Sequence, residues 1–480
     1  LNAQGGQPPP VVPPVVPPVD SMRADSAAAR VVRDSVKAPY TVSAAPSFAG
    51  VGRAPRWGRD EIFQMGATNV AELIERIPGA QILRTGLLLA PQAITWWGET
   101  GRVRVFLDGL ELDRMDPREG SVRDLGAISV WQLEEVIAEP TPAELRVYLR
   151  TWRVARTAPE TRVDVLTGDQ ESNVYRGFYG RRFQSGLGLQ FGFQQFGTVF
   201  RSAGGDGDAL ALFARLGWTR AAWSIDLVSQ RDRRARSATL RRDAPGSVPA
   251  YAGNVAQSYV RLAYRSPEGD APWAQMILST ASFRESTLPQ QLGPAYGTVP
   301  ADTADTVATR PQYVLAVGAK LLGVRTTATA RYRTFGDKNA ISPSLRASWE
   351  RARAAVNASV DRSSEDSLMR VDVGVRVEAL PRLTISLQFS QRSPFDERPG
   401  VATTFARVEG LVRIGRMVLR GGVIRRDSVD NSAPIMFARD LTSAPLSAAT
   451  GETFGVALPI YRALGIDVEG TLWNAATVYR

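Results

Sequence analysis

The residues best able to do chemistry in this sequence are carboxylates, because it contains neither histidine nor cysteine. It therefore lacks the commonest general base and the ligands of most zinc sites. Adjacent acids occur at Glu134-Glu135 and Glu365-Asp366. In an extended strand Glu134 and Glu135 would point to opposite faces, and the second pair lies in a serine-rich turn. We predict no catalytic residue, metal site, cofactor or enzyme activity; the alternative is a carboxylate-based hydrolase.

The basic character of the chain raises nucleic acid as a partner. The net charge is +10, and every basic residue except Lys37, Lys320 and Lys338 is arginine. A basic patch is typical of proteins that bind nucleic acid. Here the arginines are scattered singly along strand-like segments, and the densest run, 231–236, is expected to be a solvated loop. We therefore predict no nucleic acid partner.

The first part of the chain has the composition of a flexible leader. A proline-rich tract within residues 5–19 favours extended polyproline II structure, and residues 1–39 are predicted to be disordered. Residues 1–3 could be the tail of a signal-peptide cleavage site, although no intact signal peptide is present. No apolar run is long enough for a membrane-spanning helix.

A compact mixed segment follows at 58–153. Apolar residues at 70, 73, 74 and 77 lie on one face of a predicted helix over 68–77, with Thr68 as N-cap. Pro78-Gly79 is expected to end this helix. An alternating strand over 102–107 ends in the turn pair Asp108-Gly109, and two further strand-like stretches lead to residue 152.

From residue 161 onward the chain changes to alternating segments. At 371–378 and 383–390, for example, apolar residues occupy every second position and polar residues lie between them. Each segment would have one apolar and one polar face, as in a soluble sandwich or in a membrane barrel. We count about 16 such segments, each roughly 10 residues long as barrels require.

Three features favour the membrane barrel. The segments are long enough to cross a bilayer at a tilt. Very short turns, such as 350–351 and 381–382, alternate with longer loops over 231–256, 284–310 and 427–451. Aromatic residues near the ends of the segments resemble the girdles of membrane barrels: Trp218, Trp223, Trp273, Tyr332, Trp349 and Trp473.

The order of these pieces resembles the TonB-dependent outer-membrane receptors. In that family a helix ends in a Pro-Gly turn, a strand ends in Asp-Gly, and an acidic strand leads into the barrel. The matching stretches are 73–80, 103–109 and 128–137, and the motif residues are Leu73, Pro78, Gly79, Asp108, Gly109, Glu135 and Val136. The chain departs from the family pattern at 96–98 and at 139–144.

The resemblance implies a mainly β protein, a transmembrane antiparallel β-barrel with a small α+β plug domain in its lumen. The implied parts are the leader 1–39, a TonB-box-like segment and linker at 40–57, the plug at 58–153 and the barrel at 154–480. A plugged transporter of this family is expected to have about 22 strands, so we expect the sequence to be truncated at its C-terminus; the alternative is a smaller barrel that the plug could not fit inside. The expected TonB box consists of Tyr40, Thr41, Val42, Ser43 and Ala44.

The function implied by the resemblance is uptake of a scarce nutrient through the outer membrane of a Gram-negative cell. The expected partners are outer-membrane lipid, the periplasmic TonB complex and an unknown small ligand. The alternative is an adhesion or assembly barrel that transports nothing. Polar residues of the barrel strands are expected to hold the plug, with these candidates: Arg331, Arg333, Asp372, Arg376 and Glu378.

Overall fold

The fold is taken from a computed structural model of the chain. It describes residues 36–40, 50–51, 54–84, 89, 92–99, 102–112, 125–168, 171–200, 205–237, 239–240, 247–248, 251–287, 306–335, 338–364, 367–395, 402–428, 448–461 and 464–474. No helix in these ranges is long and apolar enough to cross a membrane.

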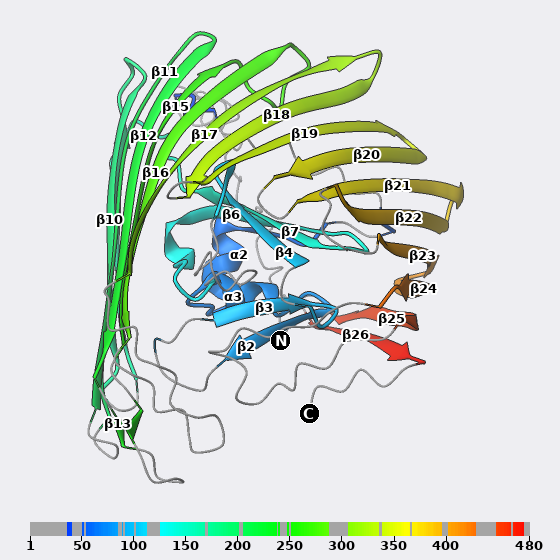
Figure 1. Cartoon of the computed structure of the whole chain (residues 1–480), viewed down its shortest axis with the longest axis horizontal. Helices are drawn as coiled ribbons and strands as arrows, with labels where there is room; N and C mark the ends of the chain where they lie inside the picture. Colours follow the sequence, from blue (N-terminus) through cyan, green and yellow to red (C-terminus); the bar gives the residue numbers. More distant parts are fainter. Residues whose placement is uncertain are drawn as a thin grey trace, which may run out of the picture.

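Most of the described chain forms one large antiparallel sheet, which we call the wall. It contains 17 strands, close to the 16 counted from the sequence, and the strands pair in chain order. No pairing joins β26 to β8 among the described residues, so the wall is a curved, open sheet (Figure 1). Its strands are β8 (Glu160–Thr167), β9 (Asn173–Arg182), β10 (Leu187–Phe200), β11 (Gly205–Arg220), β12 (Trp223–Arg236), β15 (Tyr251–Tyr264), β16 (Trp273–Thr287), β17 (Thr306–Leu321), β18 (Val324–Phe335), β19 (Lys338–Arg351), β20 (Ala354–Ser363), β21 (Leu368–Leu380), β22 (Leu383–Pro394), β23 (Thr403–Ile414), β24 (Met417–Arg426), β25 (Ala449–Tyr461) and β26 (Leu464–Trp473).

The two rims of the wall differ in their connections. One rim carries mostly two-residue turns, such as 221–222, 322–323 and 381–382, and we call it the short-turn rim. The opposite rim carries the longest connections, including 288–305 and 427–448, and we call it the long-loop rim. Strands β13 (Thr239–Leu240) and β14 (Ser247–Val248) form a separate hairpin in the connection between β12 and β15.

The wall has the two faces that the alternation predicted. In β22 the outward Leu387 and Phe389 are 52% and 43% exposed, whereas the inward Ser386 and Ser390 are 1% and 0% exposed. The same pattern holds along β10 and β21. The described part of the chain has no second sheet packed over the apolar face, as a sandwich would have. An uncovered apolar surface of this extent is typical of a lipid-facing barrel.

An inner domain fills the hollow of the wall (Figure 1). Its five-stranded sheet has the order β1-β6-β7-β4-β5, and β2 and β3 form a separate hairpin. The elements are β1 (Arg56–Gly58), α2 (Arg59–Gln64), α3 (Val70–Ile74), β2 (Ala80–Arg84), β3 (Gln92–Trp96), β4 (Val103–Leu107), β5 (Leu110–Glu111), the 3-10 helix η2 (Val130–Gln132), β6 (Leu133–Pro140) and β7 (Leu145–Thr151). Its apolar core joins α3 to β4, β6 and β7.

The predicted helix over 68–77 is shorter than expected. Helix α3 begins after Asn69, whose side-chain oxygen accepts a hydrogen bond from the backbone N–H of Glu72 at 3.2 Å. Asn69 is therefore the N-cap, and Thr68 instead donates its hydroxyl to the Glu72 carboxylate. The predicted apolar face is correct, because Val70 and Ile77 at its two ends are buried.

Three further predictions are wrong. The arginine-rich run 231–236 is not a loop but the end of β12, where Arg234 and Arg236 are buried on the inner side. The long loops are correspondingly shorter than predicted, because β12 and β16 extend into the first two and β25 begins within the third. Trp273 and Trp473 do not belong to an outer girdle: Trp273 is 4% exposed, and Trp473 packs against Trp97 of the inner domain at 5.7 Å between ring centroids.

Candidate functional site

The motif residues of the inner domain fall into core positions and turns. Leu73 in α3 and Val136 in β6 are fully buried. Pro78 and Gly79 form the turn after α3, and Gly79 has φ 92°. A Cβ at Gly79 would lie 2.9 Å from the ring of Trp97, so this turn requires glycine for both its conformation and its packing.

The Asp108-Gly109 pair connects β4 to β5 with φ values of 49° and 90°. Two successive positive φ values define the type I′ turn, for which Asp-Gly is a preferred sequence. The carboxylate of Asp108 points toward the wall. It accepts a hydrogen bond from Tyr259 Oη at 2.5 Å and from the backbone N–H of Thr151 at 3.0 Å. The backbone carbonyl of Asp108 accepts a bond from Arg261 at 2.6 Å.

Three strands of the wall, β11, β12 and β15, complete this site around Asp226. Arg215 donates to both carboxylate oxygens of Asp226, at 2.8 and 2.5 Å, and Arg261 lies 3.3 Å from the second oxygen. All three side chains are 0–1% exposed. A further bond from Arg215 reaches the Thr151 hydroxyl at 3.0 Å. We call this group the Asp108 cluster: Asp108, Thr151, Arg215, Asp226, Tyr259 and Arg261.

The environment keeps Asp108 ionised. Burial alone would raise the pKa of its carboxyl group. The positive charges of Arg261 and Arg215, together with the hydrogen bonds from Thr151 and Tyr259, outweigh this effect. The pKa of Asp108 is therefore lower than its ordinary value of 3.8.

The described end of the N-terminal segment binds beside this cluster. The backbone N–H of Tyr40 donates to Ser224 Oγ at 3.2 Å, and the Tyr40 hydroxyl donates to the carbonyl of Ala221, in a turn of the short-turn rim. The carbonyl of Tyr40 accepts a bond from Arg261 at 3.5 Å. Arg261 thus contacts the N-terminal segment, the inner domain and the wall. The other TonB-box-like residues, 41–44, lie outside the described residues.

A second polar site is built on the segment that departs from the family pattern. Residues 141–144 form a tight turn in which the Thr141 hydroxyl donates to the Glu144 carbonyl at 2.8 Å and accepts from the Glu144 N–H at 3.0 Å. This turn places the Glu144 carboxylate, 1% exposed, against the wall. There it lies 2.5 Å from Arg146 and 3.0 Å from Arg392 of β22.

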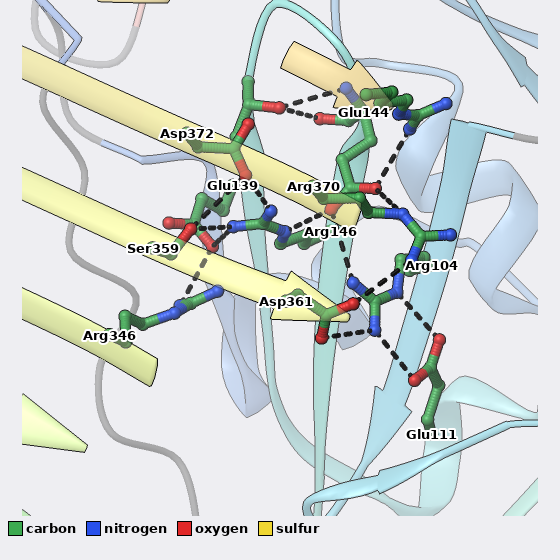
Figure 2. A network of polar contacts seen from close by, with 12 residues as sticks. Arg104, Glu111, Glu139, Glu144, Arg146, Arg346, Ser359, Asp361, Arg370 and Asp372 are labelled. Atoms are coloured by element: carbon green, nitrogen blue, oxygen red, sulfur yellow. Dashed lines mark hydrogen bonds and ion pairs between the residues drawn. The ribbon is translucent and has the colours of Figure 1, made fainter. Parts of the chain in front are cut away.

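Strand β4 extends the same network. Arg104 forms a two-bond contact with Glu111, at 2.8 and 2.9 Å, and lies 3.3 Å from Asp361 of β20. Arg146 of β7 pairs with Asp372 of β21. Figure 2 shows these contacts converging from the inner domain and the wall. We call the group the Glu144 cluster: Arg104, Glu111, Glu139, Glu144 and Arg146 of the inner domain with Arg331, Arg333, Arg346, Asp361, Arg370, Asp372 and Arg392 of the wall.

Charge complementarity also shifts the pKa values in this cluster. Burial alone would raise the pKa of Glu144, but Arg146, Arg104, Arg392 and Arg370 lower it well below its ordinary value of 4.5. Glu144 is therefore ionised wherever the protein is folded near neutral pH.

Three of the five lumen residues predicted to hold the plug do so. Arg333 lies 3.0 Å and Arg331 3.9 Å from the Glu111 carboxylate, and Asp372 pairs with Arg146. Arg376 instead pairs with Glu350 of the wall, and the structure gives Glu378 no side-chain contact with the inner domain.

The inner-domain partners of the wall residues were missed from the sequence. These are Arg104, Glu111, Glu139, Glu144 and Arg146. The available signal was the departure at 139–144, which places two acids next to an arginine-containing strand.

The adjacent acids at 134–135 do not form a catalytic pair. Glu134 pairs with Arg153 at 2.7 Å, whereas Glu135 contacts Arg56 and, at 3.3 Å, Arg150. Each carboxylate is thus neutralised by different arginines, as expected for neighbours on a strand. The pair 365–366 lies outside the described residues.

No protein-family model matches this chain. No curated protein matches it either. Several solved structures do share its fold. A ferric enterobactin receptor of Pseudomonas aeruginosa, with enterobactin bound, is 12% identical with a TM-score of 0.64, covering 88% of this chain and 81% of its own. The ferric yersiniabactin uptake receptor of Yersinia pestis is 11% identical with a TM-score of 0.58, covering 88% and 78%. A siderophore receptor of Acinetobacter baumannii is 9% identical with a TM-score of 0.64, covering 92% and 82%.

These similarities extend over both the inner domain and the wall. The chain therefore has the plug-and-barrel fold of siderophore receptors. This confirms the TonB-dependent receptor fold that the helix, Pro-Gly, Asp-Gly and alternation patterns predicted.

Proposed function

We propose that this protein is an outer-membrane receptor that binds a small nutrient outside the cell and imports it with energy relayed by TonB. The observation that best supports this proposal is that two buried ion-pair clusters hold the inner domain inside a wall whose outer face is apolar. Such an outer face suits lipid, and a polar inner face suits a folded plug. In this proposal residues 58–153 are the plug and 154–480 belong to the barrel.

The arrangement of the N-terminal segment supports coupling to a periplasmic partner. Residues 36–40 lie at the short-turn rim, where Tyr40 contacts both Ala221 and Ser224. Short turns are typical of the periplasmic side of such barrels, and long loops of the outside. A segment leaving this rim at residue 41 would be able to add a strand to a partner sheet.

For the ligand, we propose the chemical class named by the structural neighbours. Those proteins are receptors for ferric enterobactin, ferric yersiniabactin and other siderophores. The first probe is radiolabelled ferric enterobactin, given to cells that lack their own receptors for it and express this chain. Energy-dependent accumulation would support the proposal, and a panel of ferric siderophores extends the search. If no member of the panel accumulates, the siderophore class is wrong.

Coupling is tested at Val42. Proline there removes a backbone donor and fixes φ, so it should prevent strand pairing with TonB. We expect Val42→Pro to abolish uptake of the probe while binding to whole cells persists. Val42→Ala keeps the backbone donor and is the matched control, with uptake retained. Uptake that survives the proline substitution would contradict coupling through 40–44, and binding without any energised uptake in the unmodified protein would favour the adhesion alternative.

A further inference from the structure

A small cavity lies inside the Glu144 cluster, between the inner domain and the wall. Its volume is about 80 Å³. On the inner-domain side it is lined by Phe106 and Tyr148, whose rings stack with centroids 5.2 Å apart. On the wall side it is lined by residues that include Thr329 and Ser344, which are direct partners across β18 and β19. The cavity thus combines an aromatic floor with hydroxyl groups.

Arg331 lines this cavity and has donors left over. Its side chain is 10% exposed, and neither its Nε nor its Nη1 has a hydrogen-bond partner among the described residues. The nearest carboxylates, those of Glu111 and Asp361, are 3.9 and 3.8 Å from Nη1, beyond hydrogen-bond distance. A buried guanidinium with unsatisfied donors is costly, so this position favours an additional acceptor.

The charges around the cavity also favour an additional negatively charged acceptor. Three more arginines line it, Arg104, Arg146 and Arg346. Among the described residues that line the cavity there are thus four arginines and one carboxylate, that of Asp361. The Asp108 cluster, in contrast, has two of each. The excess positive charge is concentrated where the unpartnered donors of Arg331 lie.

We propose that this cavity is a binding site for a small oxyanion of the phosphate or sulfate class. Its volume of about 80 Å³ is larger than the minimum that one water needs and leaves room for a small ion. The planar fork of a guanidinium suits an oxyanion, and hydroxyl groups supply further donors. The anion would be held by Arg331 from the wall and would neutralise part of the excess charge. It would thereby connect the inner domain to the wall, a role distinct from nutrient uptake.

The test is calorimetric titration of the full chain in detergent with inorganic phosphate, in chloride buffer at constant ionic strength. We expect saturable binding with one site per chain, lost in Arg331→Gln. The matched control is Arg376→Gln, another inward arginine, which pairs with Glu350 outside the cavity. This control should bind phosphate as the unmodified protein does. Circular dichroism checks that each variant keeps its strands.

Where Arg331→Gln does not fold, Arg331→Lys is measured instead, because lysine keeps the charge but loses the fork. It should bind phosphate at least tenfold more weakly. The proposal is overturned if the unmodified protein shows no saturable binding, if Arg331→Gln retains it, or if Arg331→Lys and the unmodified protein bind equally. Equal loss in Arg376→Gln would also overturn it, since binding would then depend on overall charge.

Discussion

The two polar clusters that hold the inner domain use the same groups in different proportions. The Asp108 cluster, near the short-turn rim, is closed and balanced: Asp226 and both of its arginines are almost completely buried. The Glu144 cluster is larger and borders a cavity that four of its arginines line. In a balanced buried cluster each charge depends on one or two partners, whereas in the larger network several partners share each charge.

The two clusters also differ in the parts of the chain that they join. The Asp108 cluster includes contacts to Tyr40, so it joins the N-terminal segment to the inner domain through one guanidinium, that of Arg261. In the part of the chain that the structure describes, the Glu144 cluster joins the inner domain to the wall. We infer that the first is sensitive to loss of single groups and that the second tolerates them better.

The largest effect is expected at Asp226. Asp226→Asn leaves Arg215 and Arg261 buried with too little negative charge, which should lower the free energy of unfolding by about 3–5 kcal/mol. Urea unfolding in detergent, followed by tryptophan fluorescence, measures this. The control is Asp164→Asn, whose partner Arg162 is 46% exposed, with a cost of about 1 kcal/mol or less. Similar costs at both sites would refute a closed, balanced cluster.

A smaller effect is expected at Glu144. In Glu144→Gln, Asp361 and Asp372 still face Arg370 and Arg146, so part of the charge compensation remains. The same unfolding assay should show a loss of about 1–3 kcal/mol. A loss as large as that of Asp226→Asn would break the comparison, because it would show that the larger network does not share its charges.

As pH falls, the two clusters should begin to lose their contributions to the free energy of unfolding at different pH values. The folded-state pKa of Glu144 is lower than its ordinary value of 4.5, so its stabilising contribution is complete above that value and is lost as pH falls below it. We expect the loss to reach about 1.4 kcal/mol per pH unit for one such carboxylate. Unfolding measured from pH 6 to 3 should show a shallower decline in Glu144→Gln. In Asp108→Asn the free energy of unfolding should still begin to decline near pH 4.5, since the ordinary pKa of Asp108 is 3.8. These assignments would be contradicted if Asp108→Asn removed the decline near pH 4.5 and Glu144→Gln retained it.

The smallest effect is expected at Tyr40. Tyr40→Phe removes only the bond to the Ala221 carbonyl, at 3.1 Å, worth about 0.5–1.5 kcal/mol. Global unfolding should not change, but hydrogen exchange of the backbone amides of residues 36–38 and 40 should accelerate by about tenfold or less. Ser224→Ala, which removes the acceptor of the Tyr40 N–H, should act on the same amides. If hydrogen exchange is unchanged in both variants, these two bonds do not hold the N-terminal segment beside the Asp108 cluster.

Much of the fold could be predicted because its signals are local. A period of two determines which residues of a strand share a face, so Leu387 and Ser386 were assigned to opposite sides correctly. Asp108-Gly109 predicted its turn because few other residues adopt positive φ at both positions. Pro78-Gly79 predicted its turn because proline cannot continue the helix and glycine readily adopts the positive φ that Gly79 has. The exact start of α3 was missed because Thr68 and Asn69 are both good N-caps, and only the contact of Asn69 with Glu72 decides between them.

Periodicity could not show what each face meets. Trp473 has the position of a girdle residue, yet it packs on Trp97 because its face is the inner one. The run at 231–236 looks like a loop because it is charged, although a strand can carry charge where its inner face finds polar partners, as Arg234 does with Asp232.

Local sequence patterns suffice to predict the two-faced strands, the turns and the mixed character of the inner domain, because each depends on residues within a few positions of one another. The pairing of charges, in contrast, depends on the three-dimensional arrangement. Arg146 meets Asp372 and Glu144 meets Arg392, partners 226 and 248 positions apart. Such contacts depend on how the inner domain is placed against the curved wall, and no local pattern encodes that placement.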